Sequence, residues 1–182
     1  MRGRLTSMLC VLWAVQGCSS AGAPSPGASP APSRAIDVTE LTVEQIQTAY
    51  AAGEYNAVQL TQAFLDRIDL HEDHYNALIS MNPDALAIAA SRDDEYRSGL
   101  SRGPLHGVPV VIKDNLDYAG LVTTAGYSGF SAAAGGIDMI PGDDAAAVER
   151  LRDAGAIILG KTNLPDFAGD GTRTKSSVAG VT

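Results

Sequence analysis

One lysine of this chain stands where a run of apolar residues ends in a turn. The stretch from Gly103 to Asn115 reads Gly-Pro-Leu-His-Gly-Val-Pro-Val-Val-Ile-Lys-Asp-Asn. Its β-branched residues at 108 and 110–112 predict a short buried strand, and Asp-Asn is typical of the turn that closes one. Lys113 is therefore expected at the strand's end, where burial would favour a neutral amine that can act as a general base.

Strand alternation assigns the side chains around this lysine to two faces. Val111 and Lys113 fall on one face, and Val110, Ile112 and Asp114 fall on the other. The Asp114 carboxylate should therefore point away from the lysine amine, which leaves desolvation free to act on that amine. A lysine at a strand end can also be a surface residue without a catalytic role, and this segment alone leaves both interpretations open.

Further motifs extend in both directions from this segment. Downstream lie Thr-Thr-Ala-Gly at 123–126 and the run from 143 to 164, which continues as Pro-Asp-Phe-Ala at 165–168. Together with Lys113, these motifs resemble the amidase signature family of C–N hydrolases. Upstream stretches at 60–68, 82–86 and 102–107 continue the resemblance, which covers about residues 36–178.

The resemblance implies a role for Lys113. In that family a lysine at this position deprotonates a serine held on a cis peptide, and that serine activates a second, nucleophilic serine. Both serines come from a downstream Gly/Ser-rich segment, which does not appear before Thr182. We therefore expect the chain to be the N-terminal third of the family's domain and to be inactive alone. Ser176 and Ser177 could substitute, but they lack the flanking glycines that would let N–H groups approach an oxyanion, so we interpret them as loop polarity.

The resemblance also implies a substrate-binding role for Asp166 and Phe167, which fall where the family lines its substrate cleft. The same two residues could instead cap and bury the following turn. The substrate implied is a small-molecule or peptide amide, attacked at a non-peptide or terminal C–N bond. Which amide is hydrolysed cannot be read from these residues.

Two other motifs suggest different chemistry. Residues 155–162 satisfy the letters of a phosphate-binding P-loop, but the four residues between the glycines predict a strand, not a flexible loop. We therefore expect Lys161 to be structural, with its amine reaching loop carbonyls. His71 and His74 flank two acids and could bind zinc, yet histidines near a helix C-terminus are favourable without a metal. His106 is expected to be a packing residue, and no cofactor or metal is predicted.

The N-terminus differs from the rest of the chain. Arg2 and Arg4 precede an apolar run at 8–15, which is too short to span a bilayer and typical of a signal peptide. Val-Gln-Gly-Cys at 15–18 resembles a bacterial lipobox, in which Cys18 receives the lipid. An ordinary secretory signal, cleaved near residues 21–23, is the alternative. Both interpretations predict an exported protein.

Composition divides the chain into three parts. We predict a signal peptide at 1–18, an uncharged tether of Ala, Gly, Pro and Ser at 19–34, and a truncated amidase domain at 35–182. The formal charge of −8, with no basic stripe, argues against nucleic acid as a partner. A lipid on Cys18 would make the membrane a partner through an anchor, at the cell envelope.

The residue pattern of the domain predicts an α/β fold. Helices are expected from Thr42 to Ala52, from Asn56 past Ile68, from Pro83 to Gly99 and from Asp143 to Gly155, and strands at 77–81, 108–112 and 156–159. Strand, helix and strand in succession predict a parallel crossover, so the fold class is α/β with a mixed sheet covered by helices. The rival to an enzyme is a non-catalytic exported fragment or interaction module in which Lys113 is a relic. The family also includes a component of an ammonia-supplying amidotransferase, but an exported, acidic chain argues against that role.

Overall fold

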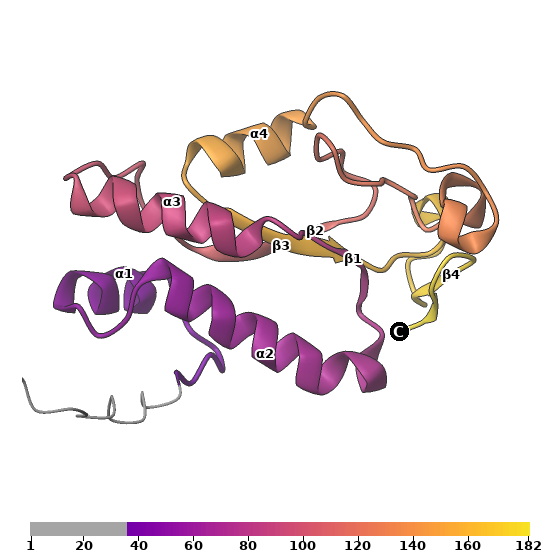
Figure 1. Cartoon of the computed structure of the whole chain (residues 1–182). Helices are drawn as coiled ribbons and strands as arrows, with labels where there is room; N and C mark the ends of the chain where they lie inside the picture. The colour runs from indigo at the N-terminus through magenta and orange to yellow at the C-terminus, as the bar shows by residue number, and fades with distance from the viewer. Residues whose placement is uncertain (1–35) are drawn as a thin grey trace, which may run out of the picture. The chain divides into compact units, whose positions relative to one another are not determined.

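The computed structural model describes residues 36–182 (Figure 1). The predicted signal peptide, tether and lipidation site at Cys18 lie outside the described residues. The principal elements are α1 (Val43–Ala52), α2 (Ala57–Tyr75), β1 (Leu78–Met81), α3 (Ala85–Arg97), β2 (Pro109–Lys113), α4 (Ala146–Asp153) and β3 (Ile157–Thr162). Shorter elements are η1 (Ser128–Phe130), η2 (Ala132–Ala134), η3 (Asp166–Ala168), β4 (Lys175–Ser176) and β5 (Gly180–Val181).

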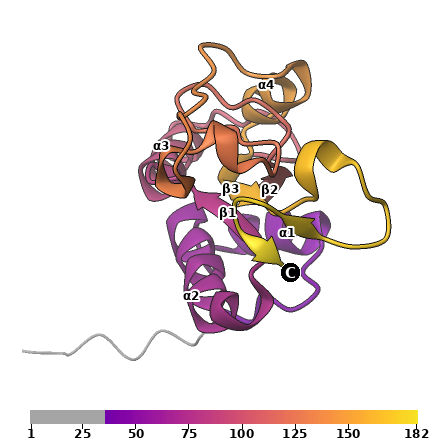
Figure 2. The same ribbon diagram turned by 90° about the vertical axis from the view of Figure 1, so that its right-hand side faces the viewer.

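The main sheet has three strands in the order β1-β3-β2. β1 runs antiparallel to β3, whereas β2 runs parallel to it, so the predicted α/β class with a mixed sheet is confirmed. The strand, helix and strand formed by β2, α4 and β3 give the parallel pair that the sequence predicts. β4 and β5 form a separate antiparallel pair near the C-terminus (Figure 2).

Local signals set the helix ends in the first half of the domain. Thr42 and Asn56 each form a reciprocal capping box, with Gln45 and Gln59 respectively, and Gly53 ends α1 in the left-handed conformation at φ 69°. These ends agree with the sequence prediction. Each box satisfies backbone N–H groups that the first helical turn would otherwise leave without partners.

The predicted start of the third helix at Pro83 is wrong. α3 begins at Ala85, after an N-cap at Asp84. Asn82 is bound to the sheet, because its backbone N–H donates to the Leu159 carbonyl at 2.8 Å and its amide donates to the Ile158 carbonyl at 2.8 Å. This attachment to β3 delays the helix, and it could not be read from the local motif.

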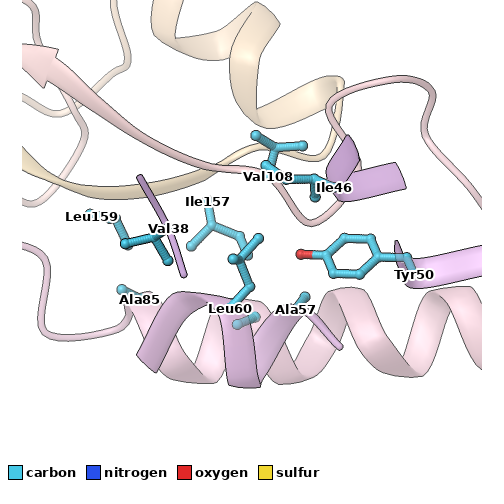
Figure 3. Close-up of a cluster of buried hydrophobic side chains, with 10 residues drawn as sticks. Val38, Ile46, Tyr50, Ala57, Leu60, Ala85, Val108, Ile157 and Leu159 are labelled. Atoms are coloured by element: carbon cyan, nitrogen blue, oxygen red, sulfur yellow. The ribbon is translucent and has the colours of Figure 1, made fainter. Parts of the chain in front are cut away.

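The two faces of the sheet bury different clusters. On one face, side chains of α1, α2 and α3 pack against β2 and β3. Figure 3 shows Leu60, Ile157 and Leu159 of this cluster pointing toward one another. The second cluster joins Ile112 and Ile158 of the sheet to Val148 of α4. Figure 1 shows α4 and α2 on opposite sides of the sheet. Helices therefore pack on both faces of the sheet.

An ionic cluster fixes the loop that enters β2. The Glu95 carboxylate on α3 pairs with Arg92 at 2.7 Å and with Arg102 at 2.7 Å. Its hydrogen bond from Arg102 is the main cause that lowers the pKa of Glu95 to about 2. His106 is only 2% exposed and its Nε2 lies 2.9 Å from the Arg92 carbonyl oxygen, so the predicted packing role is confirmed. No helix within residues 36–182 is both long and apolar enough to cross a bilayer.

Candidate active site

Lys113 ends β2, opposite Thr162 of β3 in the sheet register. The side chains on either side of it alternate as predicted. Val111 is 46% exposed and Lys113 is exposed, whereas Ile112 is 4% and Asp114 is 0% exposed. The Asp114 carboxylate therefore points into the protein, away from the lysine amine.

The expected desolvation of Lys113 is wrong for the described residues. β2 lies at an edge of the sheet, and the face that carries Val111 borders a groove of about 490 Å³ between α2 and the strands. Apolar and aromatic residues such as Phe64, Ile68 and Val111 line this groove, and no element within residues 36–182 fills it. Lys113 is exposed, and the buried cluster around Ile112 packs on the opposite face of β2.

Beneath Lys113 lies a buried ion pair between Lys161 and Asp114. The Lys161 Nζ is 2.9 Å from the Asp114 Oδ1, and both side chains are fully buried. The same amine donates to the Thr123 hydroxyl at 2.5 Å and to the Val122 carbonyl at 3.2 Å. Burial lowers the pKa of Lys161, and the hydrogen bond and charge of Asp114 oppose that shift. The prediction that this amine reaches a loop carbonyl is confirmed.

The Thr123–Gly126 segment connects the ion pair to the C-terminal loops. The Thr124 N–H donates to the Asp114 Oδ2 at 3.1 Å, and the Thr124 hydroxyl also donates to that oxygen. Gly126 has φ 78°, and a Cβ added there would lie 2.6 Å from the Leu164 carbonyl oxygen. Only glycine satisfies both constraints at this position. The backbone of this segment can therefore approach the chain just after β3, at Leu164, closely.

Asp166 and Phe167 follow β3, and they do different things. The Asp166 Oδ1 accepts a hydrogen bond from the Ser177 N–H at 2.7 Å, so it caps the following loop, as one interpretation expected. Phe167 is 60% exposed and is therefore not buried by that turn. Its backbone N–H donates to the Ala125 carbonyl at 2.7 Å, at a left-handed φ of 54°. This bond places the Phe167 ring beside the Thr123–Gly126 segment.

An aromatic cluster surrounds Phe167, and two of its members, Tyr127 and Phe130, were not predicted from the sequence. The Tyr127 ring centroid lies 5.2 Å from that of Phe167, and the Phe130 centroid lies 6.0 Å away. Tyr127 is 39% exposed, so the cluster remains accessible. Aromatic residues within a glycine-rich stretch were the available signal. These rings give an apolar surface on which a ligand side chain could pack.

The hydroxyls of the serine pair at 176–177 are engaged in hydrogen bonds with backbone groups. The Ser176 hydroxyl accepts from the Ala179 N–H at 2.9 Å, and Ser176 is only 4% exposed. The Ser177 hydroxyl accepts from the Ser128 N–H at 2.8 Å and donates to the Gly126 carbonyl at 3.4 Å. These bonds support the interpretation of the pair as loop polarity.

The P-loop motif is excluded by its conformation, because residues 157–162 of the motif are strand β3 itself. Its N–H groups cannot wrap a phosphate while they pair with β1 and β2. His71 and His74 lie in the last turns of α2. In the part of the chain that the structure describes, no three His, Cys, Asp or Glu side chains are grouped so that they could hold a metal ion.

Comparison with known proteins gives consistent matches. The family model described as Amidase matches residues 59–182. A glutamyl-tRNA(Gln) amidotransferase subunit from Chloroflexus aurantiacus is 40% identical over 150 residues, which are 80% of this chain and 29% of that protein. The native peptide amidase of Stenotrophomonas maltophilia superposes with a TM-score of 0.70 at 42% identity, covering 79% of this chain and 30% of the other. A fatty acid amide hydrolase gives 0.68 at 25% identity, covering 78% and 24%. The chain therefore spans about three tenths or less of the length of these relatives.

Proposed function

Because this chain belongs to the amidase family, we propose that the protein hydrolyses a carboxamide C–N bond and that Lys113 is its general base. One observation carries this proposal. Lys113 stands exposed at the end of β2 and forms no ion pair among the described residues, while the adjacent carboxylate of Asp114 is paired below it. The amine is thus available to exchange a proton with a group placed against the end of the sheet.

The proposed reaction proceeds by acyl transfer. The neutral Lys113 amine accepts a proton from a serine on a cis peptide, and that serine accepts the proton of a second serine as its oxygen attacks the amide carbonyl. The protonated lysine returns a proton through the same relay to the departing nitrogen, and water then releases the acid. We propose that both serines lie outside residues 36–182 and that these residues alone do not hydrolyse amides. The engaged hydroxyls of Ser176 and Ser177 support this assignment.

The proposed substrate is a non-peptide or terminal carboxamide that carries an apolar group. The exposed ring of Phe167, with Tyr127 and Phe130 around it, supports contact with that group. Asp166 is expected to act indirectly in this site, since its carboxylate already caps the Ser177 N–H. The peptide amidase match at 42% identity is compatible with such a substrate.

We also propose that the protein is exported and anchored through a lipid on Cys18. The short apolar run at 8–15, the Gly-Cys pair and the uncharged tether support this location. The relatives include a glutamyl-tRNA(Gln) amidotransferase subunit, which makes ammonia supply a second candidate function. The proposed export and the charge of −8 favour hydrolysis over that role.

A chimera tests the proposed hydrolysis. Residues 36–182 replace the matched segment of the Stenotrophomonas maltophilia peptide amidase, and ammonia release from peptide amides is measured. We expect hydrolysis, and a loss of about 10²- to 10⁴-fold in kcat for Lys113→Ala. Lys175→Ala, at another exposed lysine, is the matched control and should keep kcat within about twofold. A folded chimera in which Lys113→Ala keeps its rate would contradict the proposal.

A further inference from the structure

The charge on Asp114 is offset by a single cation. Its Oδ2 accepts hydrogen bonds from the N–H and hydroxyl of Thr124. Its buried Oδ1 faces the Lys161 ammonium at 2.9 Å, and no other group among the described residues donates to it. An ionised carboxylate that is fully buried needs such a partner. The state of Asp114 therefore depends on Lys161.

Lys161 is fully committed inside the protein. Its ammonium has three N–H donors, and three partners surround it: Asp114, the Thr123 hydroxyl and the Val122 carbonyl. Its side chain is 0% exposed, so it has neither a free donor nor access to a substrate. Lys161 can therefore influence chemistry at the end of β2 only through the groups that it holds.

The group next to this pair in sequence is Lys113. An unpaired Asp114 carboxylate would attract a proton to the Lys113 amine, because opposite charges stabilise each other across the strand. An unpaired Lys161 ammonium would have the opposite effect. When Asp114 and Lys161 are both present, their opposite charges largely offset each other at the position of Lys113. The ion pair also ties the turn after Lys113 to the Thr123–Gly126 segment, because Lys161 donates to the Thr123 hydroxyl and Asp114 accepts from the N–H and hydroxyl of Thr124.

We propose that Lys161 is a positioning residue for Lys113: it neutralises Asp114, so that the base's nearest carboxylate does not hold the base in its protonated form, and it fixes the segment on which the base stands. This inference rests on the proposed role of Lys113 as a base. Asp117 is the other carboxylate whose charge acts on Lys161, and it is not part of the ion pair.

The chain offers a direct measurement, because Lys113, Lys161 and Lys175 are its only lysines. The 182-residue chain is labelled with a trace of acetic anhydride at low ionic strength and constant pH. Acetylation of Lys113 is then quantified by mass spectrometry relative to Lys175, which is exposed and serves as the internal reference. The variants are Lys161→Met, Asp114→Asn and the double variant. Circular dichroism and urea titration establish which variants fold.

The two single changes break the same ion pair but leave opposite charges. We expect Lys161→Met to slow acetylation of Lys113 by about two- to fivefold, and Asp114→Asn to leave it unchanged or faster. The double variant should return to within about twofold of the wild type. A purely structural role would move both single variants in the same direction, and that result would overturn the proposal, as would no change in either.

Lys161→Met leaves an unpaired buried carboxylate and can fail to fold. In that case Asp114→Asn and the double variant test the proposal. Slower acetylation of Lys113 in either variant would contradict the neutralisation of Asp114 by Lys161. None of these measurements uses amide hydrolysis. A chimera without amidase activity would therefore refute the proposed function, even if the variants change the acetylation of Lys113 as expected. An active chimera whose Lys113 acetylation does not respond as expected would refute only the role of Lys161.

Discussion

Lys113 and Asp114 are neighbours in sequence, but their side chains lie on opposite faces of β2, with Lys113 exposed and Asp114 fully buried against Lys161. A strand makes this separation obligatory, because successive side chains point to opposite faces. The protein thereby keeps a carboxylate next to its candidate base without forming an ion pair between the two. Lys161 takes the carboxylate instead.

Lys113→Arg should be nearly as damaging to the chimera as Lys113→Ala. A guanidinium keeps its proton at any working pH, so it cannot accept one from serine although it retains the positive charge. We expect kcat to fall by at least about 10²-fold, measured as ammonia release. Near-full kcat in the arginine variant would show that Lys113 acts through its charge and not as a base.

Ser177→Ala in the chimera should leave kcat within about twofold, because its hydroxyl bonds only to the backbone of Ser128 and Gly126 among the described residues. The same small effect is expected for Ser176→Ala. The 182-residue chain alone should show no amide hydrolysis above background. Turnover by that chain, lost in either serine variant, would instead make this pair the nucleophile.

Glu95 should make the domain sensitive to acid. Its folded pKa is about 2, below the ordinary value of 4.5, mainly because Arg102 donates to its carboxylate. The ionised form is thus favoured by folding, so its stabilisation is complete above pH 4.5 and is lost as the pH falls from 4.5 towards 2. Urea titrations across this range should show a smaller loss of stability for Glu95→Gln than for the wild type.

Glu54→Gln, at an exposed glutamate beyond α1, is the control for that experiment and should follow the wild-type pH dependence. If Glu95→Gln also followed it, the pairs with Arg92 and Arg102 would not contribute to folding in this range.

Gly126→Ala should destabilise the domain by roughly 1–3 kcal/mol. The new Cβ would meet the Leu164 carbonyl oxygen at 2.6 Å, at a φ of 78° that side-chain-bearing residues rarely adopt. Gly171→Ala is the matched control, since nothing lies within 4 Å of its added Cβ, and it should change stability by less than about 0.5 kcal/mol. Equal unfolding midpoints for the two variants would refute the close approach at Gly126.

Cys18 should carry a lipid in the mature protein. We expect mass spectrometry of the membrane fraction to find a diacylglyceryl-modified N-terminal cysteine, and Cys18→Ala to shift the protein into the soluble fraction. An unmodified Cys18, or an N-terminus near residue 23, would indicate a secreted protein instead.

Local patterns predicted those features that depend on neighbouring residues. The capping boxes at Thr42 and Asn56 set helix starts, and the alternation around Ile112 set the faces of β2. The predicted start of α3 was wrong because Asn82 forms a hydrogen bond to β3, which is remote in sequence. The predicted burial of Lys113 was wrong, because burial depends on which elements cover a face of the strand. No motif in the segment encodes which elements those are.

The components of the site that the sequence missed are also long-range. Asp114 follows β2 whereas Lys161 lies in β3, and the Tyr127 and Phe130 rings meet Phe167 only after the chain has passed through α4 and β3. Each of these residues carries an ordinary local signal. The contact between Asp114 and Lys161 depends on the parallel pairing of β2 with β3.

The central position of β3 also determines when the fold can form. β1 and β2 pair with β3 and not with each other, yet β3 is the last of the three to be synthesised. Neither earlier strand has its partner until residue 162 has left the ribosome. Contacts between such distant segments slow folding, because loop closure precedes the gain from pairing. The nascent chain therefore carries its first three helices without a complete sheet to pack on until β3 emerges.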